Sequence, residues 1–123
     1  MIQISEAESR VMQVLWEAAP RSAEEVIAAL ADAGWAEGTI KTLLNRLLTK
    51  GAVSASKDGR RFFYSPLIAR DAWVLEESRS LLDRLFDGKV APLVAHFSQH
   101  RKLSPADVAE LRQLLKELDD EQH

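Results

Sequence analysis

The apolar pattern of this chain changes from helical to alternating spacing near residue 52, and that change limits the folds open to it. Upstream, Ser5 and Ser22 each precede a glutamate by three residues, which is the sequence of a helix capping box. Apolar residues at helical spacing follow each box, and a third such stretch covers 40–48. Downstream, Asp58-Gly59 separates two stretches of strand composition and is typical of a hairpin turn. Three short helices followed by a β-hairpin indicate a winged helix-turn-helix domain.

The bounds of these elements follow from residues that stop helices and strands. We expect the first helix to end before Pro20, the second at Gly34 and the third at Lys50-Gly51. The two strands of the wing are expected at 52–57 and 60–65.

Helical spacing returns after the hairpin. One helix is expected to begin at Asp71 or the next residue, and Ser104-Pro105 is typical of the start of another. The predicted fold is therefore mainly α with a small β-hairpin wing. It divides into a winged helix-turn-helix domain at 1–70 and a helical domain at 71–123.

The helical domain is expected to need a partner surface. So short a segment has too little interior to bury its leucines on its own helices. An identical chain is the commonest partner, so we expect a homodimer. The residues expected at its dimerisation interface are Leu75, Leu82, Leu85, Phe86, Leu93, Val94, Phe97, Leu111, Leu115 and Leu118.

The charge of the chain is unevenly distributed. The formal net charge is −3, yet residues 38–61 hold six basic residues against one acid, Asp58. The flanking parts, 1–37 and 71–123, are both net acidic. A local basic patch is what phosphate binding requires, although a solvated surface patch would have the same composition.

The outer face of the third helix carries the residue types that read DNA. Arg and Lys approach guanine edges or phosphates, Asn pairs with adenine, and Thr contacts phosphate or a thymine methyl group. An ordinary polar helix face would carry Glu–Lys pairs, whereas this face, which extends to Lys50, has no acid after Glu37. The predicted DNA-binding residues are Gly38, Thr39, Lys41, Thr42, Asn45 and Arg46 on the helix, with Arg60 and Arg61 on the wing.

Composition argues against several other functions. The absence of cysteine excludes disulfides, cysteine-based zinc sites and a thiol nucleophile. No apolar run approaches the ~20 residues that span a bilayer, and the acidic start of the chain is not a secretory signal, so a cytoplasmic protein is expected.

His96 and His100 have a metal-compatible spacing but no third ligand nearby. We expect no metal, no cofactor and no enzymatic activity. Trp16 and Trp35 are expected to be packing residues.

Several motifs together resemble one family. They are I-S-E-A-E and V-M-Q-V-L-W near the start, W-A-E-G-T-I-K-T-L-L-N-R-L-L-T-K-G and G-R-R-F-F-Y-S-P-L in the middle, and S-R-S-L-L-D-R-L-F-D-G and P-L-V-A-H-F later. With these motifs the chain resembles, almost end to end, the BlaI/MecI/CopY family of bacterial repressors, which includes the penicillinase repressors.

The resemblance implies a homodimeric repressor of a resistance or stress operon, such as one for β-lactam resistance. Its winged helices would bind a palindromic operator in double-stranded DNA, and its C-terminal helices would interlock. It further implies inactivation by cleavage in the dimerisation domain, at a bond matching His96–Phe97, with a membrane sensor metalloprotease or its effector as a partner. No membrane insertion of this chain is implied.

Three departures from the family are visible. The third helix opens with Ala36-Glu37-Gly38 where the family often has a Ser-Pro-Lys-like run, so a lysine is missing at Gly38. The chain also lacks the Cys-x-Cys pair of the copper-responsive members, so it is not expected to sense copper through thiolates. At His96 the better-known members have Asn. Two alternatives stay open: a winged-helix module that binds protein, and a repressor released by a small-molecule signal.

Overall fold

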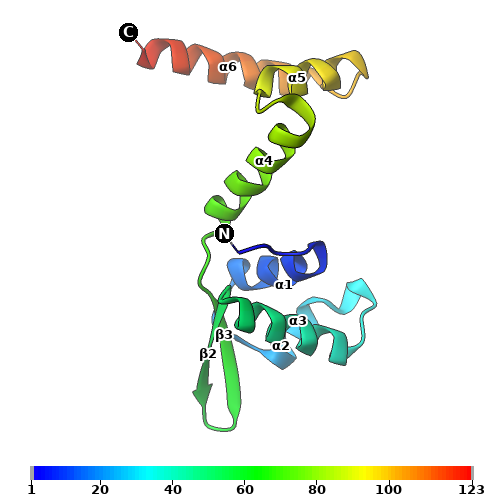
Figure 1. Cartoon of the computed structure of the whole chain (residues 1–123), viewed down its shortest axis with the longest axis vertical. Coiled ribbons are helices and arrows are strands. Elements are labelled where there is room, and N and C mark those ends of the chain that lie inside the picture. The colour runs from blue at the N-terminus through cyan, green and yellow to red at the C-terminus, as the bar shows by residue number, and fades with distance from the viewer. Residues whose placement is uncertain (1, 123) are drawn as a thin grey trace. The chain divides into compact units, whose positions relative to one another are not determined.

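The structure, a computed structural model, describes residues 2–122. It is mostly helical with one small antiparallel sheet, which confirms the predicted fold class (Figure 1). The chain forms two compact units, Met1–Val74 and Leu75–His123. In chain order the elements are α1 (Glu6–Glu17), β1 (Arg21–Ser22), α2 (Ala23–Ala29), the 3₁₀ turn η1 (Ala31–Ala33), α3 (Glu37–Lys50), β2 (Val53–Asp58), β3 (Arg61–Pro66), α4 (Arg70–Phe86), α5 (Val90–Gln99) and α6 (Pro105–Glu121).

Both predicted capping boxes are present. The Ser5 hydroxyl accepts the Glu8 N–H at 3.1 Å, and the Glu8 carboxylate accepts the Ser5 N–H at 2.8 Å. Ser22 and Glu25 repeat this exchange at the start of α2. Each box satisfies backbone donors that the first helical turn leaves without partners.

The second helix is shorter than the sequence predicts. α2 ends at Ala29, and a separate 3₁₀ turn then leads to Gly34, whose φ of 72° lies in the left-handed region. The glycine signal therefore marked the end of the turn and not of the helix. The end of α3 is confirmed: Gly51, with φ 79°, donates its N–H to the carbonyls of Leu47 and Leu48.

The wing turn lies one residue later than predicted. Asp58 pairs with Arg61 across the hairpin, so the two central turn residues are Gly59 and Arg60 and not Asp58 and Gly59. Gly59 has φ 64°, the positive value that a type II′ turn requires at its first central position. Both strands shift by one residue with the turn, and Arg60 moves from the returning strand to the tip.

A third strand was not predicted. The sheet order is β1-β3-β2, and β1 pairs with β3 through Arg21 opposite Tyr64 and Ser22 opposite Phe63. A strand of two residues has no alternation to read, and its partner lies some forty positions away. β1 thereby joins the start of α2 to the base of the wing.

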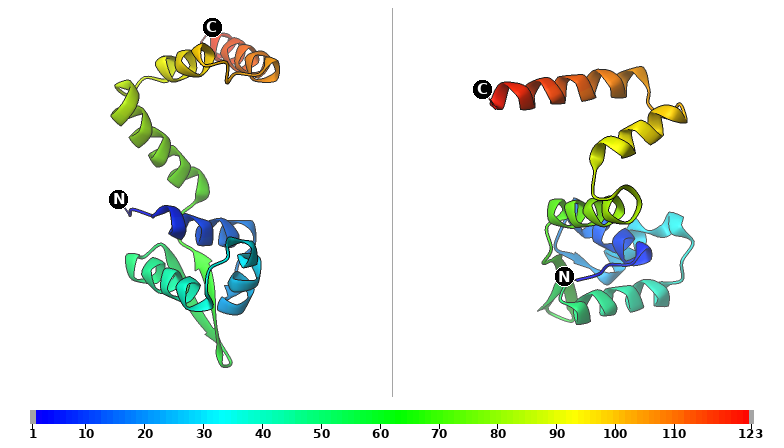
Figure 2. Two further views of the ribbon diagram at one scale, coloured as in Figure 1. Left: turned by 90° about the vertical axis from the view of Figure 1, so that its right-hand side faces the viewer. Right: turned by 45° about the horizontal axis from the view of Figure 1, so that its top comes forward.

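The hydrophobic core lies entirely in the N-terminal unit. α1, α2 and α3 lie around it (Figure 2). The first residue of β2, Val53, completes it. Trp16 and Trp35 are half-buried against this core, as expected of packing residues. The buried apolar residues are Ile4, Val11, Met12, Val14, Leu15, Val26, Leu30, Ile40, Leu43, Leu44, Leu47, Ala52 and Val53.

The C-terminal unit has a different character. Within residues 75–122, every side chain is exposed or only partly buried. A third capping box, between Ser104 and Asp107, starts α6, and Pro105 occupies its first turn as predicted. Apolar grooves run along both sides of the α5–α6 pair and are lined by both helices. Across the described residues, no helix combines the length and apolarity needed to span a membrane.

Candidate nucleic-acid interface

α3 separates its residues cleanly into two faces. Ile40, Leu43, Leu44 and Leu47 are buried in the core. The opposite face is solvent-exposed at every position that the sequence predicts for DNA: Gly38, Thr39, Lys41, Thr42, Asn45 and Arg46. The structure therefore brings these six residues onto one accessible helix surface, while their contact with DNA stays a prediction.

The wing presents the second group of cations. Arg60 lies in the turn, Arg61 begins β3, and both are exposed. Lys57 extends over the ring of Phe62, with its ammonium 5.9 Å from the ring centroid. α3 packs against β2 in the same compact unit, and the hairpin projects beyond the helices (Figure 1). Two cationic surfaces of one compact unit are thus available to a single polyanion.

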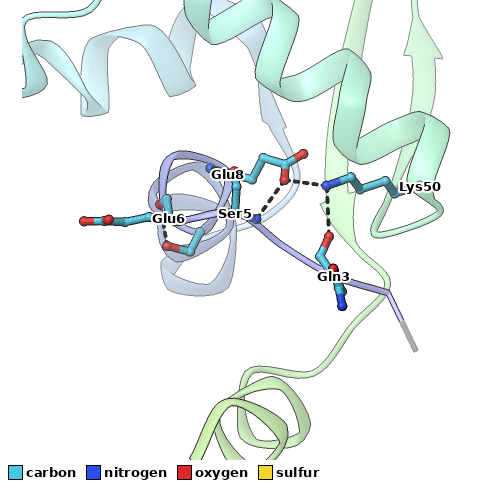
Figure 3. A network of polar contacts seen from close by, with 6 residues as sticks. Gln3, Ser5, Glu6, Glu8 and Lys50 are labelled. Carbon is cyan, nitrogen blue, oxygen red and sulfur yellow. Dashed lines mark hydrogen bonds and ion pairs between the residues drawn. The ribbon is translucent and has the colours of Figure 1, made fainter. Parts of the chain in front are cut away.

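Lys50, at the last position of α3, does not extend the basic face in the way that its helical position indicates. Its ammonium donates to the Glu8 carboxylate at 2.5 Å and to the Gln3 carbonyl oxygen at 2.9 Å (Figure 3). The Glu8 side chain is only 2% exposed. One of the six basic residues of the 38–61 stretch is therefore neutralised within the protein, which helical periodicity could not reveal.

Hydrogen bonding determines the charge state of Glu8. Burial raises the pKa of its carboxyl group, but the bonds from Lys50 and from the backbone and hydroxyl of Ser5 outweigh burial and hold that pKa below 4.5. The second carboxylate oxygen, Oε2, is buried and has no partner among the described residues. The Glu8 carboxyl group is thus ionised at neutral pH, and its bond to Lys50 links the start of α1 to the end of α3.

The first turn of α3 has no side-chain cap. Ala36 occupies the N-cap position without any side-chain hydrogen bond, unlike the serine caps of α1 and α2. Trp35, just before it, lies under the guanidinium of Arg10 at 5.4 Å from the ring centroid. This cation–π contact attaches the start of α3 to α1. A β-carbon at Gly38 would meet no atom within 4 Å, so packing does not demand glycine there.

Among the described residues, Thr42 makes the one side-chain hydrogen bond within the exposed face of α3. Its hydroxyl donates to the carbonyl oxygen of Gly38, one turn earlier, at 2.9 Å. The side chains of Lys41, Asn45 and Arg46 make no hydrogen bond to another described residue.

The paired histidines do not form part of a larger site. The rings of His96 and His100 lie 4.6 Å apart on α5, but no group of three possible metal ligands exists among residues 2–122. The glutamate of the second capping box, Glu25, is exposed and bonded to Ser22.

Sequence comparisons with known proteins identify a family. The family model described as "Penicillinase repressor" matches residues 4–117. The penicillinase repressor of Bacillus licheniformis is 38% identical over 116 residues, covering 94% of this chain and 91% of that protein. The methicillin resistance regulatory protein MecI of Mammaliicoccus sciuri is 31% identical and covers 92% of this chain and 93% of its own length.

A solved structure links this similarity to DNA. It is the solution structure of the Bacillus licheniformis BlaI monomeric form in complex with the blaP half-operator. It superposes with a TM-score of 0.51 at 42% identity, covering 58% of this chain and 89% of that one.

Proposed function

Since the chain belongs to the penicillinase repressor family, we propose that it is a dimeric repressor that binds an operator sequence through α3 and its wing. The observation that carries this proposal is the outer face of α3, which is exposed, basic and free of acidic side chains after Glu37. A polyanion can approach it without displacing any carboxylate. The relative whose complex with a half-operator is known supports the same reading.

Each residue has a proposed role. Lys41 and Arg46 contact guanine edges or phosphates, and Asn45 pairs with adenine in the major groove. Arg60 and Arg61 contact phosphate or enter the minor groove beside the reading helix. Gly38, Thr39 and Thr42 complete the surface that meets the base edges.

A salt titration of operator binding tests this role. The logarithm of the binding constant should fall linearly with the logarithm of the salt concentration. The slope should be about −0.9 for each phosphate contacted. A stable protein complex with no DNA binding at moderate salt would instead support the winged-helix interaction module. Release from DNA by a small metabolite, with the chain intact, would support the small-molecule alternative.

Dimerisation is proposed through the C-terminal unit. Leu75, Leu85 and Phe97 are 44–63% exposed, and α6 exposes Leu115 and Leu118. Leu82, Phe86, Leu93, Val94 and Leu111 are partly buried on the same helices. Burial of this surface against an identical chain removes it from water, at about 25 cal/mol per Å². A dimer would hold two reading helices about 34–36 Å apart, one turn of DNA. Analytical ultracentrifugation at micromolar protein should show a dimer.

Induction is proposed to proceed by proteolysis at the His96–Phe97 bond, with a sensor metalloprotease or its effector as the partner. The bond lies in the second half of α5, and the Phe97 carbonyl accepts the Lys102 N–H at 2.8 Å in the turn that follows. A protease needs an extended substrate, and helix ends open locally more readily than helix centres. Cleavage would remove all of α6 from the interface. The regulated operon is proposed to confer resistance, such as to β-lactams.

A further inference from the structure

The hydroxyl of Thr42 is already occupied within the protein. It has a single hydrogen, and that hydrogen is donated to the Gly38 carbonyl at 2.9 Å. Of the threonines on α3, only Thr42 makes such a bond within the part of the chain that the structure describes. A phosphate oxygen accepts hydrogen bonds and donates none, so Thr42 cannot bind phosphate through this hydroxyl without breaking its helical bond.

What Thr42 offers to a ligand is therefore its methyl group and the lone pairs of its oxygen. The residue is exposed on the same face as Lys41 and Asn45. One turn earlier, Gly38 has no side chain, and the space where a β-carbon would stand is empty. The surface beside the Thr42 side chain is consequently bare backbone, which a base edge can approach closely.

We propose that Thr42 is a specificity-determining residue that reads the 5-methyl group of a thymine in the major groove, through its own methyl group and over the bare surface at Gly38. This inference rests on the proposed function, since it needs α3 to lie in the groove. Thymine is the base whose major-groove edge carries a methyl group, and an apolar contact to it distinguishes thymine from cytosine. The bond to Gly38 holds the threonine in one rotamer, so the contact does not have to order a mobile side chain.

The test replaces thymine by deoxyuridine, which removes the methyl group and keeps every hydrogen-bonding atom. The operator is first selected from random duplexes with the full chain, and each thymine of a half-site is then exchanged in turn. One position should lose about fourfold in affinity, the effect of losing one buried methyl group. The other positions should change less.

The Thr42→Ser and Thr42→Val variants separate the methyl group from the hydroxyl. Serine keeps the hydroxyl and its helical bond but lacks the methyl group, so the variant should bind thymine and deoxyuridine equally at the sensitive position. Valine keeps a methyl group, so the variant should retain the discrimination. The Thr49→Ser variant makes the same change near the end of α3 and should discriminate as the unchanged protein does. If valine abolishes discrimination and serine preserves it, the oxygen is the reader and the proposal is overturned.

Gly38→Ala tests the close approach independently. The new β-carbon meets no protein atom within 4 Å, so the melting temperature should stay the same or rise. Discrimination between thymine and deoxyuridine should nevertheless fall, and an unchanged discrimination would overturn the role given to Gly38.

Failure of this inference is distinguishable from failure of the proposed function. If no duplex is selected, the chain does not read DNA and the proposed function fails. If a half-site is selected but contains no thymine that responds to demethylation, the operator role stands and the thymine contact is wrong.

Discussion

The ammonium of Lys50 and the carboxylate of Glu8 form an ion pair that ties the last turn of α3 to the first turn of α1 (Figure 3). Glu8 simultaneously closes the first capping box, and Lys50 also binds the Gln3 carbonyl. The C-terminal end of α3 is thus fixed by the same carboxylate that caps the first helix. The N-terminal end of α3 is attached to α1 by the stacking of Arg10 on Trp35.

The two partners of this pair should not be equivalent. Glu8→Gln should lower the free energy of unfolding by about 1–2 kcal/mol, because the freed ammonium of Lys50 is partly exposed and can reach water. Lys50→Met should cost more, because it leaves a buried carboxylate without its cation. Urea denaturation at pH 7 measures both, and a larger loss for Glu8→Gln would contradict this account.

The pair should also make stability depend on acid. Because the pKa of Glu8 is lower in the folded chain, its contribution to stability is complete above about pH 4.5 and is lost as the pH falls through the folded-state pKa. The difference in urea midpoint between the unchanged chain and Glu8→Gln should therefore shrink between pH 5 and pH 3. Glu25, whose pKa is lowered by its bonds to Ser22, should show the same sign in a separate Glu25→Gln variant.

Residues that contact bases and residues that contact phosphates should differ in how their loss changes the salt dependence of operator binding. Asn45→Ala should relax sequence preference at a cost of about 1–3 kcal/mol, and Arg61→Ala should weaken all sequences alike and reduce the salt slope by about one. Lys50→Gln is the matched control, because its charge is already neutralised by Glu8 and its loss should leave the salt slope unchanged. Unchanged operator affinity in both Asn45→Ala and Arg61→Ala would remove the assignment.

The N-terminal unit should need the first turn of α4. The indole N–H of Trp16 donates to the Ile68 carbonyl at 2.8 Å, and the ring lies 5.5 Å from that of Trp73. A chain ending after Pro66 lacks both contacts, while one ending after Glu76 keeps them. The shorter chain should be less stable by at least the roughly 0.5–1.5 kcal/mol of an aromatic pair. Both should be monomers that bind an operator more weakly than the full chain, since one half-site contact replaces two tethered ones. Thermal unfolding followed by tryptophan fluorescence compares their stabilities.

Induced cells should contain a chain cut between His96 and Phe97. Loss of α6 and its leucines should remove several side chains of the proposed interface, at about 2–5 kcal/mol each, and should thereby shift the protein to monomers and lower operator occupancy. Mass spectrometry of the recovered repressor measures the fragments. An intact chain released from DNA by another signal would exclude cleavage, and a Phe97→Ala chain cut at the same bond would show that the ring does not guide the protease.

Several helix starts and ends of this protein could be predicted from its sequence, because the residues that cap a helix lie within one turn of its end. A capping box spans one helical turn, so Ser5 and Glu8 indicate the start of α1 whatever the rest of the chain does. The glycine at position 51 ends α3 for the same reason, since a left-handed residue stops a helix wherever it occurs. The exposed face of α3 follows from the helical period once its buried stripe is known.

Tertiary structure decided the contacts between distant residues. Lys50 reaches Glu8 across 42 positions and Trp16 reaches Ile68 across 52, and no local pattern encodes which helix faces will meet. The pairing of β1 with β3 and the one-residue shift of the wing turn have the same origin, because strand register depends on the partner strand. The capped starts of α1, α2 and α6 and the end of α3 could therefore be predicted from the sequence, although the end of α2 could not. The pairing that removes one cation from the basic face required the packed core that brings α1 against α3.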